Sequence, residues 1–250
     1  MPHPFAFSLA KGWESANLNK PMTEQPPKFG ALSFCATPCD PVAFVLAGGK
    51  STRMGRDKAS LSFAGQPLAV RALSLLREAG LQASLVGAHS SLASFAPIIE
   101  DLEPGLGPLG GICTALAATT ARLAVFLPVD LPLLPVSLVT LLVHHAQVTF
   151  RAVTLPAVNG FTQTFPVVLD RAALPSLRAE LAVGRRGCFA AFQAAASSLG
   201  QPVSVVPIEL LVQAGQVDHP DGIPPLHWFL NLNSPADLQR AEVLVSRCIA

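Results

Sequence analysis

The chain has 250 residues, half of them apolar, and its formal net charge is +1. Its 17 Lys and Arg residues are scattered, whereas a nucleic-acid-binding protein usually carries a basic patch, so we expect no nucleic-acid partner. The length suits one large α/β domain or two small ones.

Residues 1–40 differ in composition from the rest of the chain. They contain several Pro, Ser and Asn residues without sustained periodicity, which predicts a poorly ordered extension before a single domain over residues 41–250. The apolar piece at residues 4–10 is short for a signal peptide and lacks a basic region. The five cysteines are scattered, and Cys35 and Cys39 lack the second pair that would complete a zinc site. We therefore expect reduced thiols and a cytoplasmic protein.

From residue 42 onward, short apolar runs alternate with segments of helical spacing. Strands are expected at 42–46, 83–86, 98–99 and 123–127, and helices at 67–79, 109–119 and 136–145. Further strands are expected at 151–155, 165–169 and 203–208, with helices at 172–181, at 188–195 and from the N-cap Ser234 to residue 246. The alternation predicts a mostly parallel sheet with right-handed crossovers, in a single three-layer α/β/α domain.

Residues 123–143 are nearly all apolar, and the mean hydropathy of the chain is positive, so a membrane span has to be considered. Asp130, Pro128, Pro132 and Pro135 interrupt this stretch, whereas a spanning helix needs about 20 apolar residues without such breaks. We interpret it as a buried parallel strand, a loop and a helix, and we expect no membrane partner. A membrane-associated protein stays open as an alternative on hydropathy alone.

The segment at residues 46–58 carries the strongest functional signal. It follows an apolar strand, and it contains three glycines and four basic side chains. Glycines let the backbone turn sharply and place N–H groups against phosphates, and basic side chains neutralise phosphate charge. A Walker A loop would need glycine at position 44, which is Phe44, and the spacing does not fit a dinucleotide fingerprint either.

The sequence Leu46-Ala47-Gly48-Gly49-Lys50-Ser51-Thr52-Arg53-Met54-Gly55-Arg56-Asp57-Lys58 resembles the L-A-G-G-x-S-x-R-M-G-x-D-K signature of nucleotidyltransferases with a GT-A-like Rossmann core, and most closely that of the molybdenum cofactor guanylyltransferases. Three further blocks resemble the same family in the same order. They are residues 99–112 with the acidic turn and the G-P-L-x-G helix start, residues 126–132 with the strand before Asp130, and residues 231–238 with N-x-N-S-P-x-D-L.

The resemblance implies a reaction and a set of site residues. The family joins GMP from GTP to a molybdopterin phosphate and releases pyrophosphate with Mg²⁺, so GTP and the molybdenum cofactor are the expected ligands. Cofactor-delivery proteins and molybdoenzymes are expected as possible transient protein partners. Asp130 is implied as the Mg²⁺ ligand, and Lys58 and Arg53 as catalytic groups on the triphosphate. The nucleotide is implied to meet Leu46, Ala47, Gly48, Gly49, Lys58, Asp101 and Asp130, and the acceptor Asn231, Asn233, Arg185 and Arg186.

Purely structural roles stay open for several of these residues. Asp130 suits a helix N-cap, Asp101 a solvated turn, Asn231 and Asn233 turn and capping chemistry, and the two arginines a charged helix start. Family members commonly carry Asn at the end of the second strand, and Gly87 stands in that region here. A related cytidylyltransferase or sugar-phosphate nucleotidyltransferase, or a non-catalytic nucleotide-binding module, is therefore the alternative function.

Overall fold

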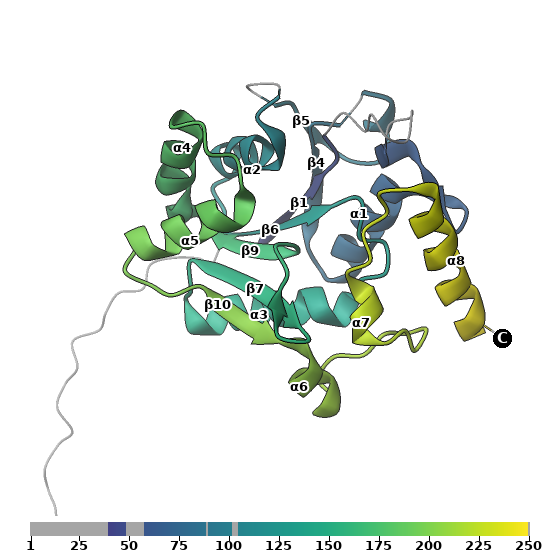
Figure 1. The fold of residues 1–250 in the computed structure, drawn as a ribbon. Coiled ribbons are helices and arrows are strands. Elements are labelled where there is room, and N and C mark those ends of the chain that lie inside the picture. Colours follow the sequence, from purple (N-terminus) through teal and green to yellow (C-terminus); the bar gives the residue numbers. More distant parts are fainter. Residues whose placement is uncertain (1–39, 49–57, 89, 102–104, 250) are drawn as a thin grey trace, which may run out of the picture. The chain divides into compact units, whose positions relative to one another are not determined.

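The computed structural model describes residues 40–48, 58–88, 90–101 and 105–249. Within these ranges the chain forms a mixed, mostly parallel sheet with helices on both faces (Figure 1), which confirms the predicted three-layer α/β/α class. The sheet runs in the order β10-β7-β9-β6-β1-β4-β5, with β8 paired to β7, and β2 and β3 form a separate hairpin. The strands are β1 Val42–Leu46, β2 Ser62–Phe63, β3 Gln66–Pro67, β4 Gln82–Val86, β5 Ile98–Ile99, β6 Leu123–Pro128, β7 Val153–Val158, β8 Phe161–Thr162, β9 Val167–Asp170 and β10 Ser204–Pro207.

Strand direction divides the sheet into two regions. β5, β4, β1 and β6 are parallel neighbours, so their carboxyl ends share one edge. β9 runs antiparallel to both β6 and β7, and β10 is parallel to β7. The chain builds outward from β1 to β4 and β5 on one side and later returns to β6 on the other, so the order reverses between β1 and β6. Open α/β sheets bind ligands beside such a reversal, at the carboxyl ends of the strands.

Successive side chains of the central strands point alternately to the two faces of the sheet, and this creates two hydrophobic cores. Ala43 and Val45 of β1 face one cluster of buried side chains, whereas Phe44 and Leu46 face the other. β6 divides in the same way, and its Phe126 stacks on Phe44 with ring centroids 5.3 Å apart. Because successive side chains of a strand point to opposite faces, a strand covered on both sides is apolar throughout.

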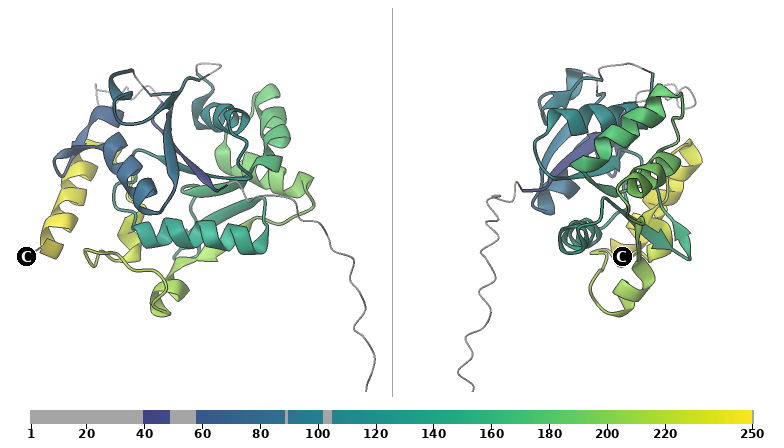
Figure 2. Two further views of the ribbon diagram at one scale, coloured as in Figure 1. Left: turned by 180° about the vertical axis from the view of Figure 1, so that it is seen from behind. Right: turned by 90° about the vertical axis from the view of Figure 1, so that its left-hand side faces the viewer.

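Each core is closed by its own layer of helices, as Figures 1 and 2 show. The helices α2 (Gly107–Ala118), α4 (Leu174–Ala182) and α5 (Cys188–Ser198) bury side chains in the cluster that contains Phe44. The helices α1 (Leu68–Glu78), α3 (Val136–Thr149), α6 (Ile208–Gln213), α7 (Pro225–Trp228) and α8 (Pro235–Ile249) contribute to the other.

Helix α1 illustrates how the sequence sets these elements. Leu68, Leu73 and Leu76 lie on its buried face, at helical spacing. Gly80 ends the helix with φ of +78°, a conformation that favours glycine, and its N–H donates to the carbonyl of Arg77.

The predicted elements are confirmed with shifted boundaries. The sequence placed Ile208 in the last strand, but it begins α6, because Pro207 cannot donate a ladder hydrogen bond and ends β10. The strand expected at 151–155 lies at Val153–Val158, and α3 continues four residues beyond the expected end. The short elements β2, β3, β8, α6 and α7 were not predicted. The predicted extension over residues 1–40 falls almost wholly outside the described residues.

The stretch at residues 123–143 forms β6, a loop and the first part of α3, as interpreted from the sequence. Within the described ranges, none of the helices has the length and apolar character needed to cross a membrane.

Candidate active site

The carboxyl ends of the parallel strands are tied together by backbone hydrogen bonds. Ala47 N–H donates to the Val86 carbonyl at 3.0 Å, Gly87 N–H donates to the Ile99 carbonyl at 3.0 Å, and Val129 N–H donates to the Leu46 carbonyl at 3.3 Å. The residues that follow β1, β4, β5 and β6 therefore lie next to one another. This edge includes the reversal between β1 and β6, where a ligand site is expected.

Three predicted site residues from distant parts of the chain meet at this edge. Lys58 Nζ donates to Asp130 Oδ2 at 2.8 Å and to Asn233 Oδ1 at 2.7 Å. Lys58 begins a short 3₁₀ helix, Lys58–Ser60, whereas Asp130 follows β6 and Asn233 precedes α8. The side chains of Lys58 and Asp130 are only 18% and 20% exposed, so the ion pair is partly shielded from water. The contact unites three of the sequence blocks that resemble one family.

Backbone and capping contacts hold Asn233 and Asp130 in place. Leu232 N–H donates to the backbone carbonyl of Asp130 at 3.0 Å, which fixes the two segments side by side. Asp237 N–H donates to Ser234 Oγ at 3.2 Å, and the Ser234 hydroxyl donates to Asp237 Oδ2 at 2.8 Å. The same carboxylate accepts from Asn233 N–H at 3.1 Å. This capping box begins α8 and also orients Asn233.

The two carboxylate oxygens of Asp130 differ in their surroundings within the described ranges. Its Oδ1 is buried and has no hydrogen-bond partner among the described residues, while Oδ2 is paired with Lys58. A buried oxygen without a partner is costly unless a ligand completes it. The described part of the chain contains no group of three or more His, Cys, Asp or Glu suited to a metal. Mg²⁺ commonly binds one or two carboxylates together with substrate phosphates, so the residues present fit this ion.

The carboxylate of Asp101 is in a similar situation. Its Oδ1 is buried without a hydrogen-bond partner within the described ranges, and burial raises its pKa. Three glycines surround the carboxylate. A Cβ atom would lie 3.5 Å from Asp101 Oδ2 at Gly48, 2.9 Å from it at Gly87, and 3.4 Å from Asp101 Oδ1 at Gly111. The lack of side chains at these three positions leaves space for Asp101 and for close approach of a ligand.

Gly87 lies in the region where the resemblance led us to expect Asn. Its φ is +66°, and an added Cβ would lie 3.1 Å from Gly48 Cα as well as 2.9 Å from Asp101 Oδ2. No side chain fits there without a shift of Asp101 or of the β1 end, so this departure from the family pattern is matched by the local packing.

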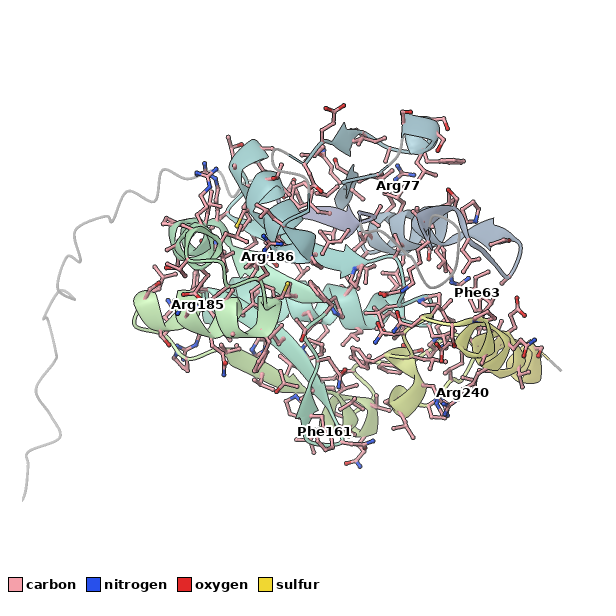
Figure 3. The ribbon with its side chains drawn as sticks, turned by 45° about the horizontal axis from the view of Figure 1, so that its top comes forward. Phe63, Arg77, Phe161, Arg185, Arg186 and Arg240 are labelled. Carbon is pink, nitrogen blue, oxygen red and sulfur yellow. The ribbon has the colours of Figure 1, made fainter. Side chains whose placement is uncertain are left out.

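The predicted acceptor residues do not gather in one place. Arg185 makes a two-pronged ion pair with Glu180, at 2.6 and 2.8 Å, which raises the pKa of Arg185. Arg186 instead reaches from the α4–α5 connection to the carbonyl of Gly105 at 2.9 Å, close to the start of α2. Figure 3 shows both arginines on the side of the molecule covered by α2, α4 and α5, well apart from α8. Among the described residues, Asn231 Nδ2 donates to the Phe229 carbonyl at a long 3.5 Å.

The glycine loop is described only at its two ends. Leu46, Ala47, Gly48 and Lys58 are placed, whereas Gly49 and Arg53 lie outside the described residues. Leu46 and Ala47 are expected to meet the nucleotide, but the Leu46 carbonyl and the Ala47 N–H are used in the sheet-edge hydrogen bonds. Sequence reasoning missed Gly111 as a neighbour of Asp101, although the pair Gly110-Gly111 at a helix start is a signal for close packing.

Comparison with known proteins identifies the family to which the sequence is similar. Residues 43–200 match the family model of the MobA-like NTP transferase domain. A molybdenum cofactor guanylyltransferase from Xanthomonas euvesicatoria is 44% identical over 117 residues, which cover 45% of this chain and 60% of that protein. The match thus spans less than two thirds of that relative's length. A molybdenum cofactor guanylyltransferase from Rhizobium meliloti is 30% identical over 215 residues, which cover 81% of this chain and 90% of that protein.

A solved structure shares the fold. The crystal structure of molybdopterin-guanine dinucleotide biosynthesis protein A from Archaeoglobus fulgidus aligns with a TM-score of 0.65 and 22% identity, over 82% of this chain and 98% of that one. At this identity the likeness concerns the fold alone.

Proposed function

Because the chain belongs to the MobA-like NTP transferase family, we propose that it is a nucleotidyltransferase that transfers GMP from GTP to the molybdopterin phosphate of the molybdenum cofactor. The relatives from Xanthomonas euvesicatoria and Rhizobium meliloti carry the name of this activity. The observation that carries the proposal is the contact of Lys58 with both Asp130 and Asn233. It brings a lysine from the end of the glycine loop, a strand-end carboxylate and an amide from the segment before α8 to one point, at the edge of the sheet where open α/β folds bind ligands.

The reaction requires no protein nucleophile. An oxygen of the acceptor phosphate forms a bond to the α-phosphorus of GTP, and the bond from that phosphorus to the bridging oxygen of the β-phosphate breaks. Pyrophosphate leaves with the electron pair. Such transfers depend on positioning and on neutralising charge rather than on covalent catalysis. Lys58 is the catalytic cation in this proposal, and Arg53 assists it from the glycine loop.

Asp130 is the proposed Mg²⁺ ligand through its unpartnered Oδ1. When bound, Mg²⁺ neutralises the triphosphate oxygens and acts as a Lewis acid on the transferring phosphoryl group. Lys58 holds the other oxygen of the same carboxylate and so fixes the orientation of Asp130 before the ligands arrive.

The nucleotide and the acceptor are assigned to different groups of the site. Asp101, the backbone of residues 46–49 and Lys58 bind the nucleotide in this proposal. Asp101 supplies a carboxylate oxygen for a donor on the nucleotide, because its Oδ1 is unpartnered within the described ranges. Asn233 and Asn231 are assigned to the acceptor. Arg185 and Arg186 are not assigned to the attacking phosphate, because both lie well apart from α8 (Figure 3) and contact Glu180 and the Gly105 carbonyl instead.

Nucleotide selectivity tests the proposal. The purified full-length protein is incubated with Mg²⁺, molybdenum cofactor and each of GTP, CTP, ATP and UTP, and pyrophosphate release is followed. We expect release with GTP. Release with CTP alone would retain the mechanism and assign the chain to cytidylyl transfer. Nucleotide binding without release from any of the four would favour a binding module instead. Cytoplasmic localisation and transient contacts with cofactor-delivery proteins stay predictions.

A further inference from the structure

Arg71 contacts both the turn after Asp130 and the hairpin after Lys58. It lies in the first turn of α1. Its Nε donates to the backbone carbonyl of Pro132 at 2.8 Å, and Pro132 follows Asp130 by two residues. Its guanidinium carbon lies 5.2 Å from the centroid of the Phe63 ring, a cation–π distance. One side chain therefore contacts both segments that supply the Lys58–Asp130 pair.

Phe63 is a rigid support for this contact. It is fully buried in β2, five residues after Lys58. Backbone hydrogen bonds fix the intervening segment, since Leu61 N–H donates to the Lys58 carbonyl at 3.1 Å and Leu68 N–H donates to the Leu61 carbonyl at 2.9 Å. A shift of the Phe63 ring would thus be transmitted to Lys58 through a short, hydrogen-bonded piece of chain.

The same turn is held from its other side by the C-terminal region. The backbone carbonyl of Leu133 faces the His219 ring, and Asp221 N–H donates to His219 Nδ1 at 3.1 Å. Burial lowers the pKa of His219, whose side chain is 4% exposed, so the imidazole is a neutral structural partner. A pocket of about 190 Å³, lined by Arg71, Pro132, His219 and Asp221 among others, opens between these groups.

We infer that Arg71 is a positioning residue, which fixes the Asp130 turn against the Lys58 segment so that carboxylate and ammonium meet in the geometry required for transfer. Arginine suits this role because its planar fork can donate to a carbonyl while its face lies on an aromatic ring. Burial lowers the pKa of Arg71, and the carboxylates of Asp221 and Glu78 oppose that shift. The kinetic consequence rests on the proposed function, whereas the geometric one does not.

The test compares Arg71→Gln with Arg77→Gln. Arg77 belongs to the same helix and also donates to a backbone carbonyl, that of Phe95, but Figure 3 shows it well apart from Phe63. We expect Arg71→Gln to lower kcat about tenfold to a hundredfold, because small displacements of reacting groups cost about this much. KM for GTP should stay near the wild-type value. Arg71→Lys, which keeps the charge and one donor, should recover part of kcat, and Arg77→Gln should match the wild type.

A second readout needs no activity at all. Acetylation of Lys58 by acetic anhydride, followed by mass spectrometry, reports whether its ammonium is still paired. The rate should rise in Arg71→Gln toward that of Asp130→Asn and stay at the wild-type value in Arg77→Gln. Unchanged Lys58 reactivity in Arg71→Gln would overturn the inference, and so would a higher KM for the molybdenum cofactor with kcat intact. An inactive wild type would refute the proposed function while the acetylation contrast still decided the role of Arg71.

Discussion

Replacement of Lys58 by Met removes the central charge of the proposed site while keeping most of the side-chain length. In the free protein two hydrogen bonds are lost, of 2.8 Å to Asp130 and 2.7 Å to Asn233. The two charged side chains are about one fifth exposed, so solvent screens part of their attraction. We expect a loss of about 1–2 kcal/mol in the free energy of unfolding, a range typical of partly exposed polar contacts.

The effect of Lys58→Met on catalysis should be larger than its effect on stability. If the ammonium neutralises charge that develops on the triphosphate, its removal should cost about 3–4 kcal/mol of transition-state stabilisation, a factor of about 10²–10³ in kcat. Single-turnover pyrophosphate release with saturating GTP and molybdenum cofactor measures this directly, and Lys58→Arg is the charge-retaining control. A Lys58→Met enzyme that keeps a tenth or more of the wild-type kcat would refute the role of Lys58 as the catalytic cation.

A double-mutant cycle tests whether the contact between Lys58 and Asn233 operates in the working enzyme. Asn233→Ala alone removes the amide oxygen that accepts from Lys58 Nζ. If both residues act on the same ligands, the double variant should lose less than the sum of the single losses, with a coupling energy of about 0.5 kcal/mol or more. Strict additivity in kcat/KM would mean that the contact belongs to the resting protein alone.

Three further variants probe the surroundings of the site. Asp101→Asn should weaken GTP binding, measured by calorimetry, about tenfold or more, since the acceptor of the proposed hydrogen bond loses its charge. Burial raises the pKa of Asp101, so its charged form opposes folding once the pH rises through that pKa. The Asp101→Asn variant should therefore be at least as stable as the wild type at pH 7. A lower melting temperature of the variant at pH 7 would contradict this reading. In urea titrations, Gly87→Ala should lower the free energy of unfolding by more than Gly160→Ala. Both glycines have positive φ, but of the two added Cβ atoms only the one at position 87 would meet other atoms. Equal losses of about 1–2 kcal/mol would mean that the backbone conformation alone accounts for the cost and would contradict the packing argument. Ser234→Ala should cost about 1 kcal/mol of stability through the lost cap and should also lower kcat, because the cap orients Asn233, and normal kinetics with reduced stability would separate the two roles.

The fold was predictable where local signals were strong and consistent. The strand at 42–46 is followed by Ala47 and two glycines, and the next predicted helix has leucines at helical spacing with Gly80 after its end. Both signals are local, and the structure agrees with them. The short elements were not predictable in the same way. Strands of two residues such as β2 and β8 carry no period, and they form because a partner strand is present.

The candidate site was likewise predictable only in part: motifs marked single residues, whereas the contacts between them depend on the fold. Lys58, Asp130 and Asn233 could each be selected from a sequence motif, but their contact joins residues 72 and 175 positions apart and depends on the crossovers of the sheet. The pairing of Arg185 with Glu180 five residues earlier was not expected, because it forms where α4 ends and helical spacing no longer applies. Arg71 had no motif to mark it, and its contacts with Phe63 and Pro132 distinguish it from the other arginines.

The backbone hydrogen bonds explain why this site can depend on so few side chains. The Asp130 carbonyl accepts from Leu232 N–H, and the Leu46 carbonyl accepts from Val129 N–H. Main-chain contacts thus set the distances between the strand ends and the C-terminal segment. These backbone N–H and carbonyl groups can form the same hydrogen bonds whichever side chains the residues carry. Phosphoryl transfer needs accurate placement more than chemical variety. The side chains at the edge are therefore left to supply charge, through Lys58 and Asp130, and absence of bulk, through Gly48, Gly87 and Gly111 around Asp101.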